Sequence, residues 1–390
     1  MREEKYRLFA ALLRLAICNV PLTDEQKAAC DDEMIAALYE LSTKQDVAHL
    51  IAFALQSNKL LHKDSEFGEK FLKKLHAAIY RYEKLNYETA RICDTLEAEG
   101  IDFLPLKGTV LRRYYTIPWL RTSCDIDILV HGEDVERAAA ALEEKLGYRR
   151  DIVESHNLSM YSPDGVHFEL HYTLIEDGLA GKADKPLEKI WEYTVSANGS
   201  AHMKELADDM FYYYHIAHMA KHFLLGGCGA RSLVDVWILH NRSGCDLKNR
   251  GVLLDEGGLS AFEKRVCQLS EVWFDGKEAD DVIVRMEQYV LSGGTYGSLE
   301  NRISVGRARN GGSAGFLWSR LWLPYDVLRF EFPSLTGRKW LLPFYQIARW
   351  FRALFGDGRK RMVREIKRNS QISEEENDQT MSLLDEMGLR

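Results

Sequence analysis

The sequence has little of the features that mark several other classes of protein. Its seven cysteines are scattered and form no Cys-x-x-Cys pair, which argues against a zinc site and against a secreted disulfide scaffold. No apolar run is long enough to span a bilayer. The first 20 residues carry charges throughout, so they predict an amphipathic helix rather than a signal peptide. We therefore expect a cytoplasmic protein without a membrane span.

The sequence also has no excess of basic over acidic residues. The formal net charge is −8, so any attraction for phosphate must be local or carried by a bound metal. With 390 residues, 46% of them hydrophobic, the chain can form two or three packed units. We expect a helical N-terminal region over 1–100, an α/β core over 101–200, a helical C-terminal region over 201–372 and an acidic tail over 373–390.

Several helix boundaries can be predicted from local patterns. Thr23 and Gln26 form a capping box ahead of a helix near 24–41. Apolar residues at helical spacing predict a long helix near 66–98, which Gly100 ends. Residues 1–100 hold no catalytic constellation, so we expect them to pack on the catalytic sheet as a scaffold.

Two later segments look irregular in the sequence. Seven glycines within 292–315, with no preceding strand and no Gly-Lys-Ser/Thr, predict a flexible loop rather than a phosphate-binding loop. The acidic stretch 374–390 is expected to fray at the chain end.

The stretch from 103 to 130 has the pattern of a catalytic α/β unit. A short strand at Phe103–Leu106 is followed by a tight turn over 107–109 and a helix from about Val110. A loop then leads into a second strand, Asp125–Val130. A Gly-Thr turn that opens a helix offers unpaired backbone N–H groups, so it is a candidate phosphate-binding turn.

Two carboxylates share one face of the second strand. Residues alternate along a strand, so Asp125 and Asp127 point to one side and their isoleucine neighbours to the other. Burying both charges without a partner costs several kcal/mol each, and like charges this close resist joint ionisation. A hard cation such as Mg²⁺, which prefers carboxylate and phosphate oxygens, removes both problems.

A third carboxylate follows in a predicted hairpin. The strands Asn157–Ser162 and Val166–Leu174 flank a Pro-Asp-Gly turn, and Glu169 shares a face with His167 and His171. Glu169 is a candidate metal ligand beside the two aspartates, or else an exposed residue paired with a cation. His171 has three open interpretations: it orients Glu169, contacts substrate or packs.

Together these motifs resemble the nucleotidyltransferase superfamily that includes DNA polymerase beta. More closely, the chain resembles a bacterial family of uncharacterised nucleotidyltransferase-like proteins, which have a Lys-Gly turn, an Arg before Asp-Ile-Asp-Leu-Leu-Val, and an acidic-Leu-His-aromatic strand. The matching residues are Lys107-Gly108, Arg121, Asp125–Val130 and Glu169–Tyr172. The resemblance covers roughly 100–174, and more weakly continues to about 355. It implies an α+β fold: a nucleotidyltransferase-fold mixed sheet flanked by N-terminal and C-terminal helical regions.

The resemblance also implies a reaction, the transfer of a nucleoside monophosphate from an NTP to an acceptor hydroxyl. Asp125, Asp127 and Glu169 would be the catalytic residues and would hold two Mg²⁺ ions, for which Mn²⁺ is a substitute. The candidate nucleotide-binding residues are Lys107, Gly108, Thr109 and Arg121. For Lys107 and Arg121, the alternative is simple solvation at the surface.

A histidine-rich segment follows the core. Residues 205–240 predict two helices broken at Gly226-Gly227, and His215, His218 and His222 share one helical face. We interpret this face as the polar edge of the active-site cleft. The candidate substrate contacts are His171, His218, Lys221 and His222. Arg231 and Asp235 are expected to form an i,i+4 pair within the second helix.

The segment Thr336–Arg368 is strongly basic. It has ten basic and two acidic residues, a local charge of +8 in an acidic chain. Its apolar residues recur at helical spacing and include Trp340, Phe344, Ile347, Phe351 and Phe355. One hypothesis is that the segment binds RNA or an acidic partner. The alternative is that the apolar face packs on the core and the cations form a solvated rim.

Two other functions stay open beside NMP transfer to an unidentified small molecule, protein or RNA. One is a non-catalytic nucleotide- or partner-binding protein on the same fold. The other is a toxin-like enzyme that modifies tRNA ends.

Overall fold

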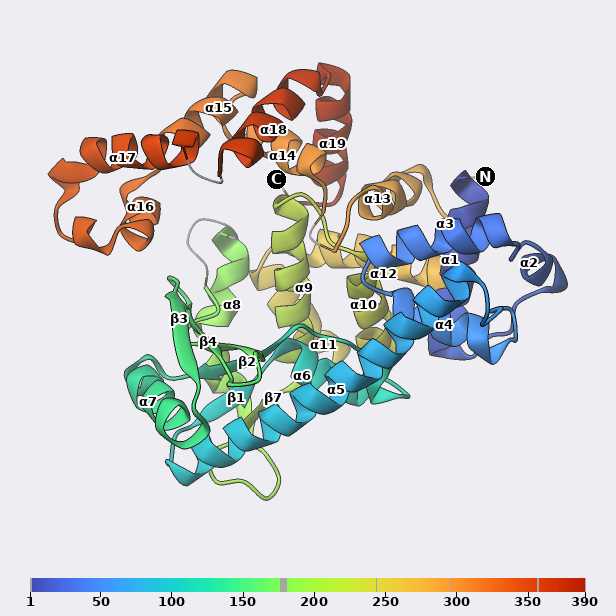
Figure 1. Cartoon of the computed structure of the whole chain (residues 1–390), viewed down its shortest axis with the longest axis horizontal. Coiled ribbons are helices and arrows are strands. Elements are labelled where there is room, and N and C mark those ends of the chain that lie inside the picture. The colour runs from blue at the N-terminus through green and yellow to red at the C-terminus, as the bar shows by residue number, and fades with distance from the viewer. Residues whose placement is uncertain (1, 176–180, 243, 296, 356–357, 390) are drawn as a thin grey trace.

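The structure is a computed structural model that describes residues 2–175, 181–242, 244–295, 297–355 and 358–389. A small mixed sheet is surrounded by helices from both ends of the chain (Figure 1). This arrangement confirms the predicted α+β class with helical regions on either side of the core. Among the described residues, no helix is both long and apolar enough to cross a membrane.

The central sheet has the strand order β1-β2-β5-β4-β3. The strands are β1 (Phe103–Pro105), β2 (Asp125–Val130), β3 (Arg149–Val153), β4 (Asn157–Tyr161) and β5 (His167–His171). Strands β2 and β5 are parallel, and the other neighbouring pairs are antiparallel. The predicted hairpin of β4 and β5 is thereby confirmed, and β5 lies directly against the Asp-Ile-Asp strand.

The N-terminal helices pack in two different places. They are α1 (Arg2–Cys18), α2 (Asp24–Ala28), α3 (Asp32–Lys44), α4 (Ala48–Ser57) and α5 (Glu66–Ala98). Helix α5 buries Leu85 and Ile92 against the sheet residue Ile126, as a scaffold helix is expected to do. Helix α1 instead packs on α4 and on the C-terminal helix that carries Trp273, whose ring meets that of Phe9 edge to face with the centroids 6.1 Å apart. The expectation that residues 1–100 pack on the sheet therefore holds for α5 and is wrong for α1.

The predicted single helix near 24–41 is two helices. The capping box of Thr23 and Gln26 is present and begins α2, as predicted. A second cap then interrupts the helix, because the Asp31 carboxylate accepts a hydrogen bond from the backbone N–H of Met34 at 2.8 Å and begins α3.

The middle of the chain supplies the helices around the sheet. They are α6 (Lys107–Leu111), α7 (Val135–Leu146), α8 (Lys185–Glu188), α9 (Asp208–Leu224), α10 (Ala230–Arg242), α11 (Leu247–Glu256), α12 (Ser260–Phe274) and α13 (Asp281–Ser292). A small ribbon of β6 (Thr194–Ser196) and β7 (Lys204–Leu206) precedes α9. Gly226 and Gly227, both at φ near +120°, separate α9 from α10 as predicted.

The glycine-rich stretch 292–315 is mostly helical, so the prediction of a flexible loop is wrong. It contains α14 (Leu299–Arg309), whose first turn is capped by the Ser298 hydroxyl, and the start of α15 (Ser313–Leu321). Gly306 serves packing here, because a Cβ at this position would lie 2.5 Å from the ring of Phe316. The glycine thus lets α14 and α15 meet closely.

The acidic C-terminal stretch is also ordered. The last helices are α16 (Tyr325–Glu331), α17 (Leu342–Phe355), α18 (Gly358–Gln371) and α19 (Glu374–Glu386). Helix α19 begins with a capping box at Ser373 and buries Met381 and Leu384 beside Val305 of α14. The expected fraying of this segment is therefore wrong, because its apolar residues have a partner helix.

Replacing Leu384 with Ala tests the docking of α19. Leu384 is fully buried, so we expect the free energy of unfolding to fall by about 2–5 kcal/mol, measured by urea denaturation. The matched control is Val363→Ala on the exposed face of α18, which we expect to change stability by about 0.5 kcal/mol or less. Equal, small effects from both variants would mean that α19 is frayed.

Candidate active site

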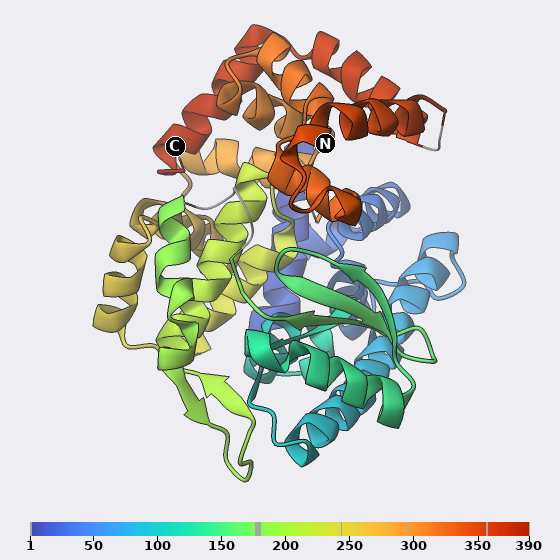
Figure 2. The ribbon, with the colours of Figure 1, turned by 90° about the vertical axis from the view of Figure 1, so that its left-hand side faces the viewer.

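The parallel pairing of β2 and β5 brings the predicted carboxylates together. In the register of this pair, Asp125 lies opposite His167 and Asp127 lies opposite Glu169. Side chains opposite each other in neighbouring strands point to the same face of the sheet, so all of these groups share one face. Of these groups, Asp125, Asp127 and Glu169 line a cleft whose other wall is α9, which both views show beside the sheet (Figures 1 and 2).

Lys107 supplies the charge that compensates these carboxylates within the protein. Its Nζ lies 2.7 Å from Oδ1 of Asp127 and 3.9 Å from Oε2 of Glu169. Burial lowers the pKa of Lys107, but the charges of Asp127 and Glu169, the neighbouring Tyr214 and the hydrogen bond to Asp127 together outweigh burial and raise the pKa well above its usual value. Lys107 also has a φ of +42°, a left-handed conformation that is uncommon for a residue with a side chain. The backbone of Lys107 is thus in an unfavourable conformation at the position from which its ammonium contacts Asp127.

The two aspartates differ in how well they are compensated. Burial raises the pKa of Asp127, but Lys107 and the hydrogen bond from His171 outweigh it, so the net shift is downward. Burial and the charge of Asp127 raise the pKa of Asp125, and Lys107 only partly opposes them. Asp125 is therefore the carboxylate of the pair with the greater need for a further cation.

His171 is buried and contacts both neighbouring carboxylates. Its Nε2 lies 3.0 Å from Oδ1 of Asp127 and 3.2 Å from Oε2 of Glu169. Burial lowers its pKa, but the hydrogen bonds to the two carboxylates outweigh burial and raise the pKa above its usual value. Of the three interpretations open from the sequence, this geometry fits an orienting role for His171.

The donor set suits a hard divalent cation. Asp127, Glu169 and His171 place one ligand atom each within 4.8 Å of one another, and so do Asp125, His167 and Glu169. Carboxylate oxygens are the protein ligands that Mg²⁺ and Mn²⁺ prefer. Glu169 belongs to both groups and so links them into one acidic centre.

The Lys107–Thr109 segment is the first turn of α6 rather than a free turn before a helix at Val110. Gly108 lines the cleft, and a Cβ at this position would lie 2.7 Å from Cβ of Ser123. Ser123 lines the cleft, whereas Thr109 is not among the described residues that line it. The proposed contact of Thr109 with phosphate stays a prediction, and Ser123 is a cleft hydroxyl that the sequence did not single out.

Arg121 lines the cleft but is held by a buried carboxylate. Its Nε lies 2.7 Å from Oδ1 of Asp235 on α10, and the Tyr115 hydroxyl donates to the same oxygen at 2.6 Å. The expected i,i+4 pair of Arg231 and Asp235 is wrong, because Arg231 instead pairs with Asp46 at 2.6 Å. The first ion pair fixes the loop before β2 to α10, and the second joins α10 to the N-terminal region.

Helix α9 forms the opposite wall of the cleft. His218 and Lys221 line the space that Lys107 and His171 also reach. Burial and the neighbouring His222 lower the pKa of His218 well below its usual value, so His218 is neutral at pH 7. Its Nε2 lies 3.3 Å from Nε2 of His222. The candidate substrate contacts on α9 therefore do face the carboxylates.

Other cleft residues were not singled out in the sequence. Glu154, His156 and Asn157 line the cleft from the start of β4, and Arg112 braces α6 from behind. The Arg112 guanidinium donates to the Gly108 carbonyl at 3.0 Å and to the Ser123 hydroxyl at 3.1 Å. No local pattern predicted these residues, since their positions at the cleft depend on tertiary contacts.

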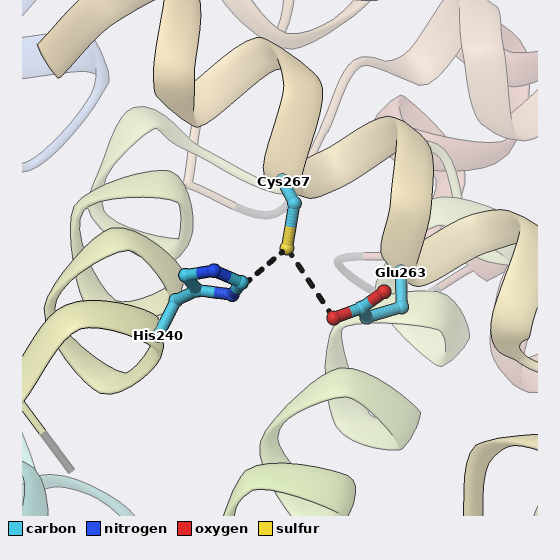
Figure 3. Close-up of side chains that lie close together, drawn as sticks. All are labelled: His240, Glu263 and Cys267. Carbon is cyan, nitrogen blue, oxygen red and sulfur yellow. Dashed lines mark hydrogen bonds between the residues drawn. The ribbon is translucent and has the colours of Figure 1, made fainter. Parts of the chain in front are cut away.

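A second group of metal-binding residue types lies on the far helices (Figure 3). His240 of α10 is 3.7 Å from the Cys267 sulfur, which lies 3.4 Å from Oε1 of Glu263. Glu263 is already bound by the Tyr212 hydroxyl at 2.8 Å and by Arg250 at 3.2 Å. Burial and the charge of Glu263 raise the pKa of Cys267 to about 12, so the thiol stays protonated. This group is a hydrogen-bonded network that joins four helices.

The fold and the cleft define a protein of the nucleotidyltransferase kind: a mixed sheet that presents carboxylates from adjacent strands beside a short helix. A model of a family described as "Uncharacterised nucleotidyltransferase" matches residues 31–275, well over half of the chain, and the chain belongs to this family. Searches of curated proteins and of solved structures returned no match. The matched range includes the residues that line the cleft, except Thr295, and ends before α13.

The hydrogen bonds of His171 predict a pH dependence. Because its pKa is raised in the metal-free fold, protonated His171 contributes stability below its usual pKa of about 6.5, and this contribution is lost as the pH rises through the raised pKa. Asp127→Asn removes a carboxylate charge that favours the protonated ring, so we expect the His171 pKa, measured by NMR, to fall. The control is His49, whose pKa burial lowers to about 4, and whose titration we expect to be unchanged. A His171 pKa that stays raised in Asp127→Asn would contradict this assignment.

Proposed function

We propose that this protein is a metal-dependent nucleotidyltransferase that moves an NMP from an NTP to an acceptor hydroxyl. In this reaction an acceptor oxygen forms a bond to the α-phosphorus while the bond to the pyrophosphate breaks. The observation that carries the proposal is the set of Asp125, Asp127 and Glu169 on one face of two paired strands, inside a cleft that also contains two lysines. We also propose a cytoplasmic location, which the scattered spacing of the seven cysteines supports.

The three carboxylates would hold two Mg²⁺ ions, with Mn²⁺ as a substitute. When bound, these ions supply neutralisation of the phosphate charge and lower the pKa of the attacking hydroxyl. The protein prepares the ligands for this role. His171 holds Asp127 and Glu169 in place through its Nε2, and the sheet fixes their spacing through the register of β2 and β5.

Lys107 is proposed to exchange partners when nucleotide binds. Its ammonium compensates Asp127 in the metal-free protein, and a metal at Asp127 would take over that role. The lysine would then be available to the phosphates at the same edge of the cleft. Gly108 leaves room beside it because it has no side chain to meet Ser123. Lys221 on α9 would add a second cation from the opposite wall.

We assign Arg121 a positioning role. Its guanidinium is engaged with Asp235 and is almost fully buried, so it fixes the loop that leads into Asp125. Neutral His218 can donate or accept a hydrogen bond without adding charge, which suits contact with a hydroxyl or a base of a substrate.

A second candidate function is binding of a nucleotide or a protein partner without catalysis. The ion pair of Lys107 and Asp127 favours it, because the site is already partly neutralised without a metal. The two functions differ in their products. A binding protein would retain the NTP, whereas a transferase would release pyrophosphate.

The position of the label in an NTP separates these functions. The protein should be incubated with Mg²⁺ and each NTP labelled at the α- or the γ-phosphate, together with small molecules, proteins or tRNA from a cell extract. We expect the α-label to enter one acceptor fraction with release of pyrophosphate. Labelling of tRNA alone would identify a tRNA-directed enzyme, and transfer of the γ-label would exclude NMP transfer. Retention of intact NTP would support the binding protein.

Glu169 provides the matched test of the site. Glu169→Gln should lower NMP transfer by at least about a hundredfold, because it removes a carboxylate shared by both groups of candidate ligands. Glu136→Gln on α7 is the control, since Glu136 is an exposed carboxylate that pairs with Arg150 at the surface. Activity should be measured together with thermal stability. Equal loss of activity in both variants would place the catalytic centre elsewhere.

A further inference from the structure

Helix α17 carries an apolar stripe that faces outward. Trp340, just before the helix, is 73% exposed, and Phe344, Ile347 and Phe351 are 64%, 45% and 60% exposed. These four positions are spaced by four, three and four residues, so they lie on one side of the helix. The expectation that this face packs on the core is wrong for these residues. We call Trp340, Phe344, Ile347 and Phe351 the outer stripe.

The opposite side of α17 makes the contacts with the protein. Gln346 is fully buried and donates to the Leu323 carbonyl at 2.5 Å, and the Trp350 indole donates to the Leu321 carbonyl at 2.7 Å. The ring of Tyr345 lies 5.0 Å from that of Phe332. The helix is thus attached by polar and aromatic groups, while its more apolar side is turned to solvent. This is the reverse of a surface helix that packs on a core.

The neighbouring helices extend the exposed apolar surface. Trp318 on α15 is 66% exposed and stacks on Trp322, and Val363 and Ile366 on α18 are about half exposed. Helices α16 and α17 lie at the left-hand end of the molecule in Figure 1, the side that faces the viewer in Figure 2. Large exposed apolar patches mark sites that contact another molecule or a membrane. All of these residues lie beyond the range that the family model matches.

Basic residues accompany the outer stripe. Arg338 and Lys339 are exposed directly before Trp340, and Arg364 and Lys367 are exposed on α18 beside Val363. Of the two acidic residues in the segment, Glu365 is paired with Arg320 at 2.7 Å, and Asp357 lies outside the described residues. The side chains of Arg359, Lys360 and Arg361 also lie outside the described part. The segment as a whole carries a charge of +8 in the sequence.

The apolar and basic composition of the outer stripe and its neighbours favours one kind of partner over others. A second copy of this chain would bring two segments of charge +8 together, which like-charge repulsion opposes. Single-stranded RNA uses aromatic side chains for stacking but has no use for exposed aliphatic groups such as Ile347, Val363 and Ile366. A lipid interface accepts both, because Trp, Phe and aliphatic side chains enter the acyl boundary while Lys and Arg meet anionic headgroups.

We propose that the C-terminal helices dock this protein on an anionic lipid bilayer, with α17 lying in the plane of the interface. The outer stripe enters the boundary between headgroups and acyl chains, and the basic residues beside it contact the anionic lipid. The contact is peripheral and leaves the cleft between the sheet and α9 open to its substrates. This proposal is independent of the reaction proposed above, since it uses none of the cleft residues.

Vesicle sedimentation with the full-length protein tests this proposal. Vesicles of equal parts phosphatidylglycerol and phosphatidylcholine are compared with vesicles of phosphatidylcholine alone. The test variant combines Trp340→Ser, Phe344→Ser and Ile347→Ser. The control variant combines Tyr80→Ser and Tyr87→Ser, which are equally exposed aromatic residues on α5. All of these side chains are at the surface, so both variants should fold, and thermal unfolding checks this.

The charge contribution is tested separately. Arg364→Gln with Lys367→Gln is compared with Lys248→Gln with Lys264→Gln, a pair of exposed lysines on α11 and α12 that gives the same change in net charge. We expect the first pair to weaken binding to the anionic vesicles and the second to leave it unchanged. We also expect added salt to weaken the binding of the wild-type protein.

Support for the proposal requires binding to the anionic vesicles that falls at least about tenfold in the stripe variant and not in the tyrosine control. NTP turnover should be the same in both variants. The proposal is overturned if the protein does not bind anionic vesicles or if the stripe variant binds them as well as wild type. It is also overturned if the stripe variant loses binding to single-stranded RNA, or loses self-association in light scattering, while lipid binding is unchanged.

Discussion

The ion pair between Lys107 and Asp127 is the interaction on which the site depends. Without it, Asp127 would be a buried carboxylate beside two others, and removing one partner from a buried pair typically costs about 3–5 kcal/mol. Lys107 is therefore the cation that compensates the buried charge of Asp127 within the protein. Its ammonium is carried by a short helix at the edge of the sheet, where the backbone of Lys107 is held in a left-handed conformation. A metal at this site must compete with that ammonium.

A second buried ion pair joins the site to the rest of the molecule. Arg121 comes from the loop before β2 and Asp235 from the middle of α10, so their contact ties the catalytic sheet to the helical C-terminal region. Arg231 makes a corresponding contact with Asp46 of the N-terminal region. Helix α10 is thus joined by ion pairs both to the loop that leads to Asp125 and to the N-terminal region. Both helical regions therefore help to hold the sheet and its carboxylates in place.

Much of the site could be predicted from local pattern, because strand alternation fixes which side chains share a face. That rule placed Asp125, Asp127 and Glu169 together, and the register of β2 and β5 agrees with it. The partners of Arg121 and Arg231 could not be predicted, since they lie far away along the chain. The loop predicted at 292–315 failed for a related reason: its glycines serve close helix contacts, as at Gly306, and the outward face of α17 likewise depends on where its polar side docks.

The affinity of the metal-free protein for Mn²⁺, measured by electron paramagnetic resonance without nucleotide, tests most directly whether Lys107 occupies the place of a metal ion. If Lys107 compensates a genuine metal site, Lys107→Ala should bind Mn²⁺ about tenfold more tightly than wild type or better, because the competing ammonium is gone. Its thermal stability without metal should fall and should recover when Mn²⁺ is added. An affinity that is unchanged or weaker in Lys107→Ala would contradict the account and would make the carboxylates a structural ion-pair cluster.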